Sequence, residues 1–208
     1  AAQDLASETG CAVADSSAAL VQDSDIIFLC VKPQQFADAA AEISPVFDAG
    51  KCAVSIMAGV PSARIRALLG GNASVVRVMP NTPCLVELGA AAVAKDTEAP
   101  AEVMDLAFSL FNALGTAVWA DEKQMDAVTA LSGSGPAYVF MFLESLADAG
   151  VAAGLDRNTA ETLAVQTVLG SAALAAQSDL SLCTLRAQVS SPAGTTVAAT
   201  GVLESSGF

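Results

Sequence analysis

Three short runs of β-branched and other apolar residues most constrain the fold of this 208-residue chain. They lie at residues 26–31 (IIFLCV), 52–57 and 75–79, and sequence with helical character separates them. Uniformly apolar runs of this length are typical of parallel strands that are buried on both faces of a sheet. Strands that alternate with helices predict an α/β domain with a parallel sheet.

The second half of the chain has a different character. After Asp121 no strand-like run remains, and the sequence becomes rich in alanine, glycine and serine. We therefore expect two domains, an α/β domain at residues 1–121 and an all-helical domain at residues 122–208. The other expected strands lie at residues 11–14, 90–94 and 117–119, and the expected C-terminal helices lie at residues 122–153, 156–177, 182–188 and 195–204.

Composition excludes several classes of function. The net charge of −13 argues against a nucleic-acid partner, because phosphates require clusters of Lys and Arg. The chain has no histidine, and its five cysteines show no metal-ligand spacing, so we expect neither a His-based catalytic triad nor a metal site. The long charge-free runs contain Gln, Thr, Ser and Gly, so we expect buried helices and no membrane span. We also expect no signal peptide and a cytoplasmic location.

The stretch at residues 189–204 (VSSPAGTTVAATGVLE) combines hydroxyl groups with a bare backbone. Ala193 and Gly194 allow a ligand to approach closely, and a helix is expected to start near Gly194. Free backbone N–H groups at a helix N-terminus form a ready site for an anion such as a carboxylate. The alternative is a plain Ser/Thr cap on a structural helix. The residues at the start of this stretch that carry hydroxyl groups are Ser190, Ser191, Thr195 and Thr196.

Each of the three apolar runs ends in a distinctive segment, and ligands of open α/β sheets bind at the carboxyl ends of the strands. A further segment, LSGSGP (residues 131–136), places glycine and proline inside a predicted helix, where they cost about 1 and 3 kcal/mol per site. It predicts a kink with close packing. The segments at the strand ends are Cys30, Val31, Lys32 and Pro33, then Ile56, Met57 and Ala58, then Asn81 within RVMPNTP.

Taken together and in order, CVKPQ, RVMPNTP, LSGSGPAY and VSSPAGTTVAATGVLESSGF resemble the motifs of the pyrroline-5-carboxylate reductase family. The resemblance covers essentially the whole chain. It departs from the family pattern at Ala193, where glycine is usual, at Thr200, where leucine is common, and at Ser17, where asparagine is frequent. No G-x-G-x-x-G occurs, and against the family the chain starts about one βαβ unit late and stops before a final helix. A fragment is therefore expected.

The resemblance implies an incomplete Rossmann-like domain followed by an all-α dimerisation domain. It implies hydride transfer from NADPH or NADH to the C=N bond of L-1-pyrroline-5-carboxylate, which gives L-proline, with the choice of cofactor left open. It implies catalytic roles for Thr196 and Ser191, and a homodimer or a higher homo-oligomer. The implied substrate site is Ser190, Ser191, Ala193, Gly194, Thr195 and Thr196, and the implied cofactor site is Ser17, Cys30, Val31, Lys32, Pro33, Ile56, Met57, Ala58 and Asn81.

Two other functions remain open on the sequence. One is a hydroxy-acid dehydrogenase of similar architecture, although such enzymes usually need a lysine base from the helical half. Beyond Lys123 at the boundary, the helical half of this chain contains only Arg157 and Arg186 as basic residues. The other is a non-catalytic relative that binds proline or a dinucleotide without turnover.

Overall fold

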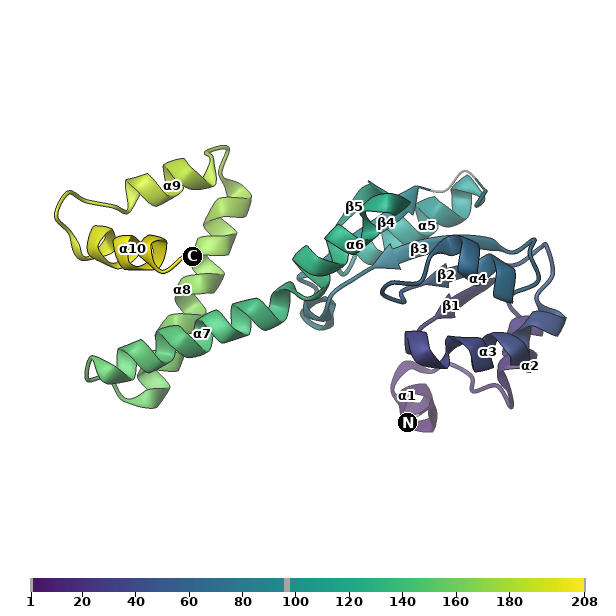
Figure 1. Ribbon diagram of the computed structural model, residues 1–208. Helices are drawn as coiled ribbons and strands as arrows, with labels where there is room; N and C mark the ends of the chain where they lie inside the picture. The colour runs from purple at the N-terminus through teal and green to yellow at the C-terminus, as the bar shows by residue number, and fades with distance from the viewer. Residues whose placement is uncertain (1, 96–97, 208) are drawn as a thin grey trace. The chain divides into compact units, whose positions relative to one another are not determined.

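The computed structural model describes residues 2–95 and 98–207 and divides into two compact units, Ala1–Tyr138 and Val139–Phe208 (Figure 1). The first unit contains a five-stranded sheet with helices, and the second is helical. The division falls within α7 (Gly135–Ala152). A domain boundary after Asp121 stays a prediction.

The strands form one sheet in the order β1-β2-β3-β4-β5. β1, β2 and β3 are parallel neighbours, as predicted, and β5 is parallel to β4. The expected parallel direction is wrong for one pair, because β4 runs antiparallel to β3. A parallel connection needs about a dozen residues or more, usually with a helix, whereas only the turn η3 (Thr82–Val86) joins these two strands. The strands are β1 (Ile26–Leu29), β2 (Cys52–Ser55), β3 (Ser74–Met79), β4 (Gly89–Lys95) and β5 (Gly115–Asp121).

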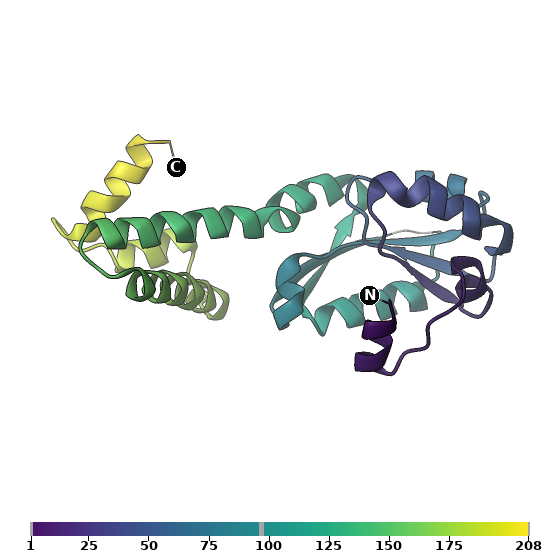
Figure 2. The ribbon, with the colours of Figure 1, turned by 90° about the horizontal axis from the view of Figure 1, so that it is seen from below.

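Alternate residues of the central strand β3 contribute to two different cores. Val75 packs in a core with Phe36 and Ile65, whereas Val76 and Val78 pack in a core on the opposite face. Figure 2 shows α3 and α5 on opposite sides of the sheet. Because both faces are covered, both alternating sets of β3 side chains are mostly apolar, and the buried Arg77 is the one charged residue of the strand. The helices of this layer structure are α2 (Ser17–Gln22), α3 (Phe36–Ile43), α4 (Ser62–Leu68) and α5 (Ala101–Asn112).

The N-terminal segment follows the prediction only in part. Helix α1 (Ala2–Thr9) ends at Gly10, whose φ of 74° suits a glycine. The strand expected at residues 11–14 is wrong, since these residues form no ladder. A strand needs a neighbour for its backbone hydrogen bonds, and β1 pairs with β2 along one edge while no described strand lines its other edge.

A helical segment interrupted by a π-turn follows β5. It consists of η4 (Glu122–Gln124), α6 (Met125–Val128) and the π-helix η5 (Thr129–Gly133), and α7 comes next. The N–H of Ser134 donates to the carbonyl of Thr129, five residues back, at 2.8 Å. Pro136 lacks an N–H and therefore cannot donate to the carbonyl of Ser132, four residues back. The irregularity expected at LSGSGP is thus a local change of helix type.

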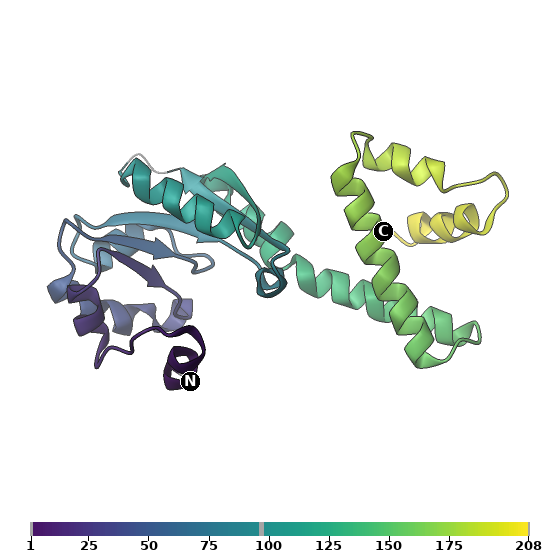
Figure 3. The same cartoon turned by 180° about the vertical axis from the view of Figure 1, so that it is seen from behind.

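Helices build the second unit, and its small core lies where α7 meets α8 (Figure 3). A Cβ added at Gly150 of α7 would lie 3.1 Å from the Cβ of Ala160 in α8, so small residues allow these two helices to approach closely. Many large apolar side chains of this unit are exposed, among them Phe140 at 59 % and Met141 at 70 %. Within the described ranges, no helix combines the length and the hydropathy that a membrane crossing requires. The remaining helices are α8 (Arg157–Gln177), α9 (Leu182–Gln188) and α10 (Thr195–Ser205).

Candidate active site

The carboxyl ends of β1, β2 and β3 lie level with one another. Leu29, the last residue of β1, pairs with Ser55, the last residue of β2, and Ser55 pairs with Arg77 near the end of β3. The segments that follow these strands therefore start at one edge of the sheet, which is where open α/β sheets bind ligands. The structure thus brings the predicted segments at Cys30, Ile56 and Asn81 to a common edge, called here the cofactor edge.

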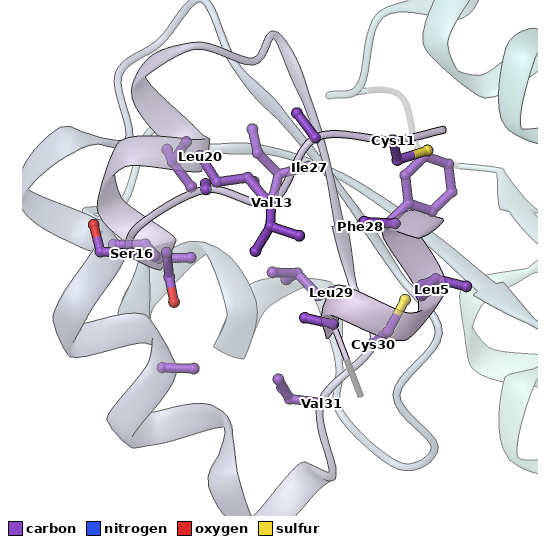
Figure 4. A pocket seen from close by; sticks show the side chains of 18 residues that line it. Leu5, Cys11, Val13, Ser16, Leu20, Ile27, Phe28, Leu29, Cys30 and Val31 are labelled. Atoms are coloured by element: carbon purple, nitrogen blue, oxygen red, sulfur yellow. The ribbon is translucent and has the colours of Figure 1, made fainter. Parts of the chain in front are cut away.

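A pocket of about 540 Å³ lies beside β1 (Figure 4). This volume is in the range of about 300–1,000 Å³ that is usual for small-molecule sites. Its walls are apolar apart from hydroxyl and thiol groups, and they carry no charged side chain. The labelled side chains Val13, Leu20, Ile27 and Leu29 gather around it in Figure 4. Ser17, Cys30 and Val31, three of the predicted cofactor residues, also line it.

In the second unit, the loop between α9 and α10 holds the predicted anion site. Gly194 is the N-cap residue of α10 and, having no side chain, provides no side-chain cap for the first turn. The alternative of a plain Ser/Thr cap is therefore wrong. The first N–H groups of α10 lack a side-chain acceptor from the cap residue, as an anion site requires.

The same loop is held in a tight conformation. The N–H of Gly194 donates to the carbonyl of Ser191 at 3.0 Å, and Ala193 between them has a φ of 57°. The left-handed region is costly for a residue with a Cβ, so Ala193 is strained where glycine would not be. Ser190 Oγ donates to the carbonyl of Arg186 at 2.7 Å. An exposed ion pair between Arg186 near the end of α9 and Glu204 near the end of α10, at 3.0 Å, connects the two helices.

Comparisons with known proteins agree with this geometry. The family described as pyrroline-5-carboxylate reductase dimerisation matches residues 122–208, and the family described as NADP oxidoreductase coenzyme F420-dependent matches residues 1–59. The pyrroline-5-carboxylate reductase of Pseudomonas aeruginosa is 42% identical over 205 residues, which cover 98% of this chain and 75% of that protein. That of Methanosarcina acetivorans is 41% identical, over 99% of this chain and 76% of that protein. The chain belongs to the pyrroline-5-carboxylate reductase family.

A solved structure supports the same assignment at the level of fold. The NADP-bound pyrroline carboxylate reductase of Plasmodium falciparum superposes with a TM-score of 0.87 and 35% sequence identity, over 94% of this chain and 74% of that chain. The expected fold class, a Rossmann-like domain followed by a helical dimerisation domain, is thereby confirmed.

Within this family fold, two predicted cofactor residues have local partners already. The Ser17 N–H and Oγ donate to the carboxylate of Glu42 at 3.1 and 3.2 Å, which fixes the start of α2 against α3. The side chain of Met57 is buried in the core, and its N–H donates to Ser55 Oγ at 3.3 Å. Direct contact of the Met57 side chain with a ligand is therefore not available in this conformation.

The other predicted residues that follow β1 and β2 are at least partly accessible. Lys32 is exposed and precedes the short helix η1 (Pro33–Gln35), in which Pro33 occupies the first position. Cys30 lines the pocket, and partial burial of its sulfur raises the pKa of the thiol, so that it stays protonated at neutral pH. Ile56 and Ala58 are half-buried in the loop that leads to α4.

Asn81 has a bridging role that the sequence did not indicate. Its Oδ1 accepts from the N–H of Ala90 at 2.9 Å, and its Nδ2 donates to the carbonyl of Ser132 at 3.1 Å. This carbonyl is available because Pro136 offers it no N–H. Asn81 therefore ties the end of β3 to the start of β4 and to the π-helix.

A cluster that sequence reasoning missed lies beside this bridge. Glu122 Oε1 accepts three hydrogen bonds, from Arg77 at 2.9 Å and from the N–H and Oγ of Ser62 at 2.7 Å each. Burial alone would raise the pKa of Glu122, but the hydrogen bonds from Ser62 and Arg77 outweigh it and hold the pKa below its usual value. The available signal was Arg77 itself, a charged residue among the valines of β3.

The expectation that no metal site occurs was drawn from composition. Among the residues that the structure describes, no group of three or more Cys, Asp or Glu is arranged to hold a metal ion. The five cysteines are all free thiols.

Proposed function

We propose that the protein reduces the C=N bond of L-1-pyrroline-5-carboxylate to give L-proline, with NADPH or NADH as hydride donor. The proposal rests on the loop between α9 and α10, residues 189–194, which is called here the anion loop because it leads into the uncapped start of α10. The chain that carries this loop is about 40% identical to named pyrroline-5-carboxylate reductases over nearly its whole length. When bound, the reduced nicotinamide supplies the hydride to the imine carbon, and a proton on the nitrogen completes the CH–NH product.

The cofactor edge has groups that fit part of a dinucleotide. The pocket beside β1 offers apolar walls and the hydroxyl of Ser16, which suit an aromatic ring and a ribose. The pocket lining carries no cation for the phosphates, and the exposed Lys32 directly follows the lining residue Val31. We assign the cofactor to this edge, with Cys30, Val31, Lys32 and Pro33 along one side and Ile56, Met57 and Ala58 contributing backbone groups.

The anion loop has the chemistry for the substrate carboxylate. The backbone N–H groups of Thr195 and Thr196 start α10 behind a cap without a side chain, and a carboxylate there gains about 0.3–1 kcal/mol from the helix dipole. The hydroxyl of Ser191 lies beside Gly194, whereas that of Ser190 donates to the carbonyl of Arg186 and would have to leave it to reach a ligand. The small residues Ala193 and Gly194 leave room for the ligand. We assign carboxylate binding to these residues, with Ser191 as a direct donor.

We assign Thr196 to the ring nitrogen of the substrate. A threonine hydroxyl is a poor acid at neutral pH, so its role is to orient the imine and to relay a proton from water. Positioning then supplies most of the catalysis, as is usual when a cofactor carries the difficult chemistry. Thr196→Ala should lower kcat/KM at least tenfold, which corresponds to about 1.4 kcal/mol of transition-state stabilisation.

A matched control exists one turn later in α10. The hydroxyl of Thr200 donates to the carbonyl of Thr196 at 3.0 Å and is therefore occupied within the helix. Thr200→Ala removes the same group from the same helix and should leave kcat/KM unchanged. Equal kinetics for Thr196→Ala and the parent would remove Thr196 from the mechanism.

The exposed apolar side chains of the helical unit indicate a homo-oligomer. The matched family is described as a dimerisation family, and contiguous exposed apolar surface marks interaction sites. We propose a homodimer formed through this unit. A stable folded monomer in light scattering of the full-length protein would contradict it. The cytoplasmic location stays a prediction.

The experiment that tests the function follows the absorbance of NADPH, and separately of NADH, with full-length protein and L-1-pyrroline-5-carboxylate. Turnover is the expected result and also decides the cofactor preference. Folded protein that binds proline without turnover would instead support a non-catalytic relative.

A further inference from the structure

A buried charge occupies the centre of the sheet. Val75, Val76 and Val78 of β3 are at most 1 % exposed, and Arg77 among them is only 6 % exposed. By strand alternation, Arg77 lies on the same face as Val75 and Met79. That face packs against Ile65 of α4 and, through Met79, against Met125 and Val128 of α6.

The partner of Arg77 joins three separate elements. Glu122 Oε1 accepts a hydrogen bond from the guanidinium of Arg77 in β3 at 2.9 Å. The same oxygen accepts hydrogen bonds from the N–H and the Oγ of Ser62, the first residue of α4, at 2.7 Å each. Ser62 is 1 % exposed, and the N-cap residue of α4, Pro61, makes no side-chain cap. Glu122 therefore caps α4 from a distant part of the chain. We call Arg77, Glu122 and Ser62 the Glu122 network.

Stability is a weak reason for such a network. Removing two charges from water is costly, and replacing a buried ion pair by apolar residues of similar volume is often neutral or stabilising. An apolar residue at position 77 would also match its neighbours in β3. What the ion pair provides, and an apolar contact would not, is a fixed direction and distance between β3, α4 and η4.

The element that the network fixes is the helical segment at residues 122–133. Its first turn is held by Glu122, and its last turn is held by Asn81, which donates to the carbonyl of Ser132 at 3.1 Å. Between these anchors Met125 is 1 % exposed, and at the far end a Cβ on Gly133 would lie 2.6 Å from Met79 Cε. The segment is thus held at both ends on the sheet face, with its second anchor at the cofactor edge.

We propose that Arg77 and Glu122 are positioning residues for the reduction. They hold residues 122–133 in the register in which Ser132 meets Asn81, and so set the shape of the cofactor edge without touching substrate or cofactor. The inference rests on the proposed function and adds two residues that the motifs alone do not assign.

The test uses the double variant Arg77→Met/Glu122→Gln in the full-length protein. Methionine is an unbranched apolar substitute for arginine, and glutamine keeps the Oε1 acceptor for Ser62, so only the ion pair is lost. We expect a melting temperature close to that of the parent and a kcat/KM lower by about 10- to 100-fold, because misplacement by about 1 Å costs this much. Hydrogen exchange should show faster exchange in residues 122–133 while β2 and β3 stay protected.

The matched control is Arg66→Met/Glu98→Gln. This pair also joins α4 to a loop, at 3.0 Å, but Glu98 is 70 % exposed and the pair lies outside the cofactor edge. Its loss should leave kcat/KM unchanged. A double variant at Arg77 and Glu122 with parental kcat/KM and parental exchange would overturn the proposal.

Two further outcomes are distinguishable. If the double variant fails to fold, the single variant Glu122→Asp tests the proposal instead. Aspartate keeps the negative charge, but its carboxylate lies one methylene further from Arg77 and Ser62. A parental kcat/KM in Glu122→Asp would overturn the proposal. If the parent itself shows no turnover, the proposed function fails, and positioning is then decided by exchange in residues 122–133 alone.

Discussion

Replacing Gly194 by alanine tests the anion loop at a single atom. The backbone of Gly194, with φ −80° and ψ 167°, suits any residue, so alanine brings no backbone strain. Its Cβ, however, would lie 2.4 Å from Ser191 Oγ and 3.0 Å from the carbonyl oxygen of Ser191. The hydroxyl of Ser191 must therefore rotate away, and the carbonyl that accepts the Gly194 N–H must shift.

The expected loss follows from the role assigned to Ser191. A hydrogen bond to a charged group contributes about 1.5–3 kcal/mol, and each 1.4 kcal/mol corresponds to about a tenfold change. Gly194→Ala should therefore raise KM for L-1-pyrroline-5-carboxylate by about 10- to 100-fold. KM for NADPH should stay unchanged, because the group that loses a partner is the substrate carboxylate. Steady-state kinetics with each substrate varied in turn separates the two constants.

Gly201 provides the control within the same helix. A Cβ at Gly201 would meet nothing within 4 Å, and alanine in a helix interior is favoured over glycine by about 1 kcal/mol. Gly201→Ala should therefore keep both KM values and melt at the same or a higher temperature. Parental KM for the substrate in Gly194→Ala, or an equal rise in both variants, would refute the role given to the loop.

Two other predictions concern stability. Ala193→Gly should raise the melting temperature slightly. Glycine relieves the strain of the left-handed region, about 1–2 kcal/mol for an L-residue, but its greater freedom in the unfolded chain destabilises the fold by about 0.5–1 kcal/mol. A lower melting temperature would contradict the strain at Ala193. Glu122 should stabilise the fold above the usual glutamate pKa of about 4.3, and this contribution should be lost as the pH falls through the lower pKa that it has in the fold. The melting temperature of the parent should then fall more steeply in acid than that of Glu122→Gln, and parallel curves would argue against the coupling.

The buried strands could be predicted because their environment is uniform. Strands that are covered on both faces are mostly apolar along their length, so β1, β2 and β3 stood out within one or two residues of their bounds, although Ser55 and Arg77 interrupt the apolar pattern. The direction of β4 was hidden for the same reason, since the run at residues 90–94 reads the same in either direction. The failed strand at residues 11–14 shows the limit of local pattern, because a ladder depends on a neighbour that the segment itself does not encode.

The segments that form the candidate site could be predicted from their motifs, but the contacts between those segments could not. The cap at Gly194 and the level ends of β1 and β2 follow from local sequence and strand order. The bond from Asn81 to Ser132 joins residues 51 apart, and that from Ser62 to Glu122 joins residues 60 apart. Neither pairing has a periodicity or a spacing that could reveal it. Arg77 was visible as an exception in a valine-rich strand, but its partner was not.

Each of the two proposed functional segments of the C-terminal sequence offers a backbone polar group that the helix itself does not use. At LSGSGP, Pro136 withholds the N–H that Ser132 would need, and the freed carbonyl accepts from Asn81 instead. At SPAG, Gly194 ends the loop without a side-chain cap, and we propose that the first N–H groups of α10 bind the substrate carboxylate. Glycine and proline within LSGSGP are unfavourable for a helix, and their cost is understandable if the released carbonyl serves the reaction.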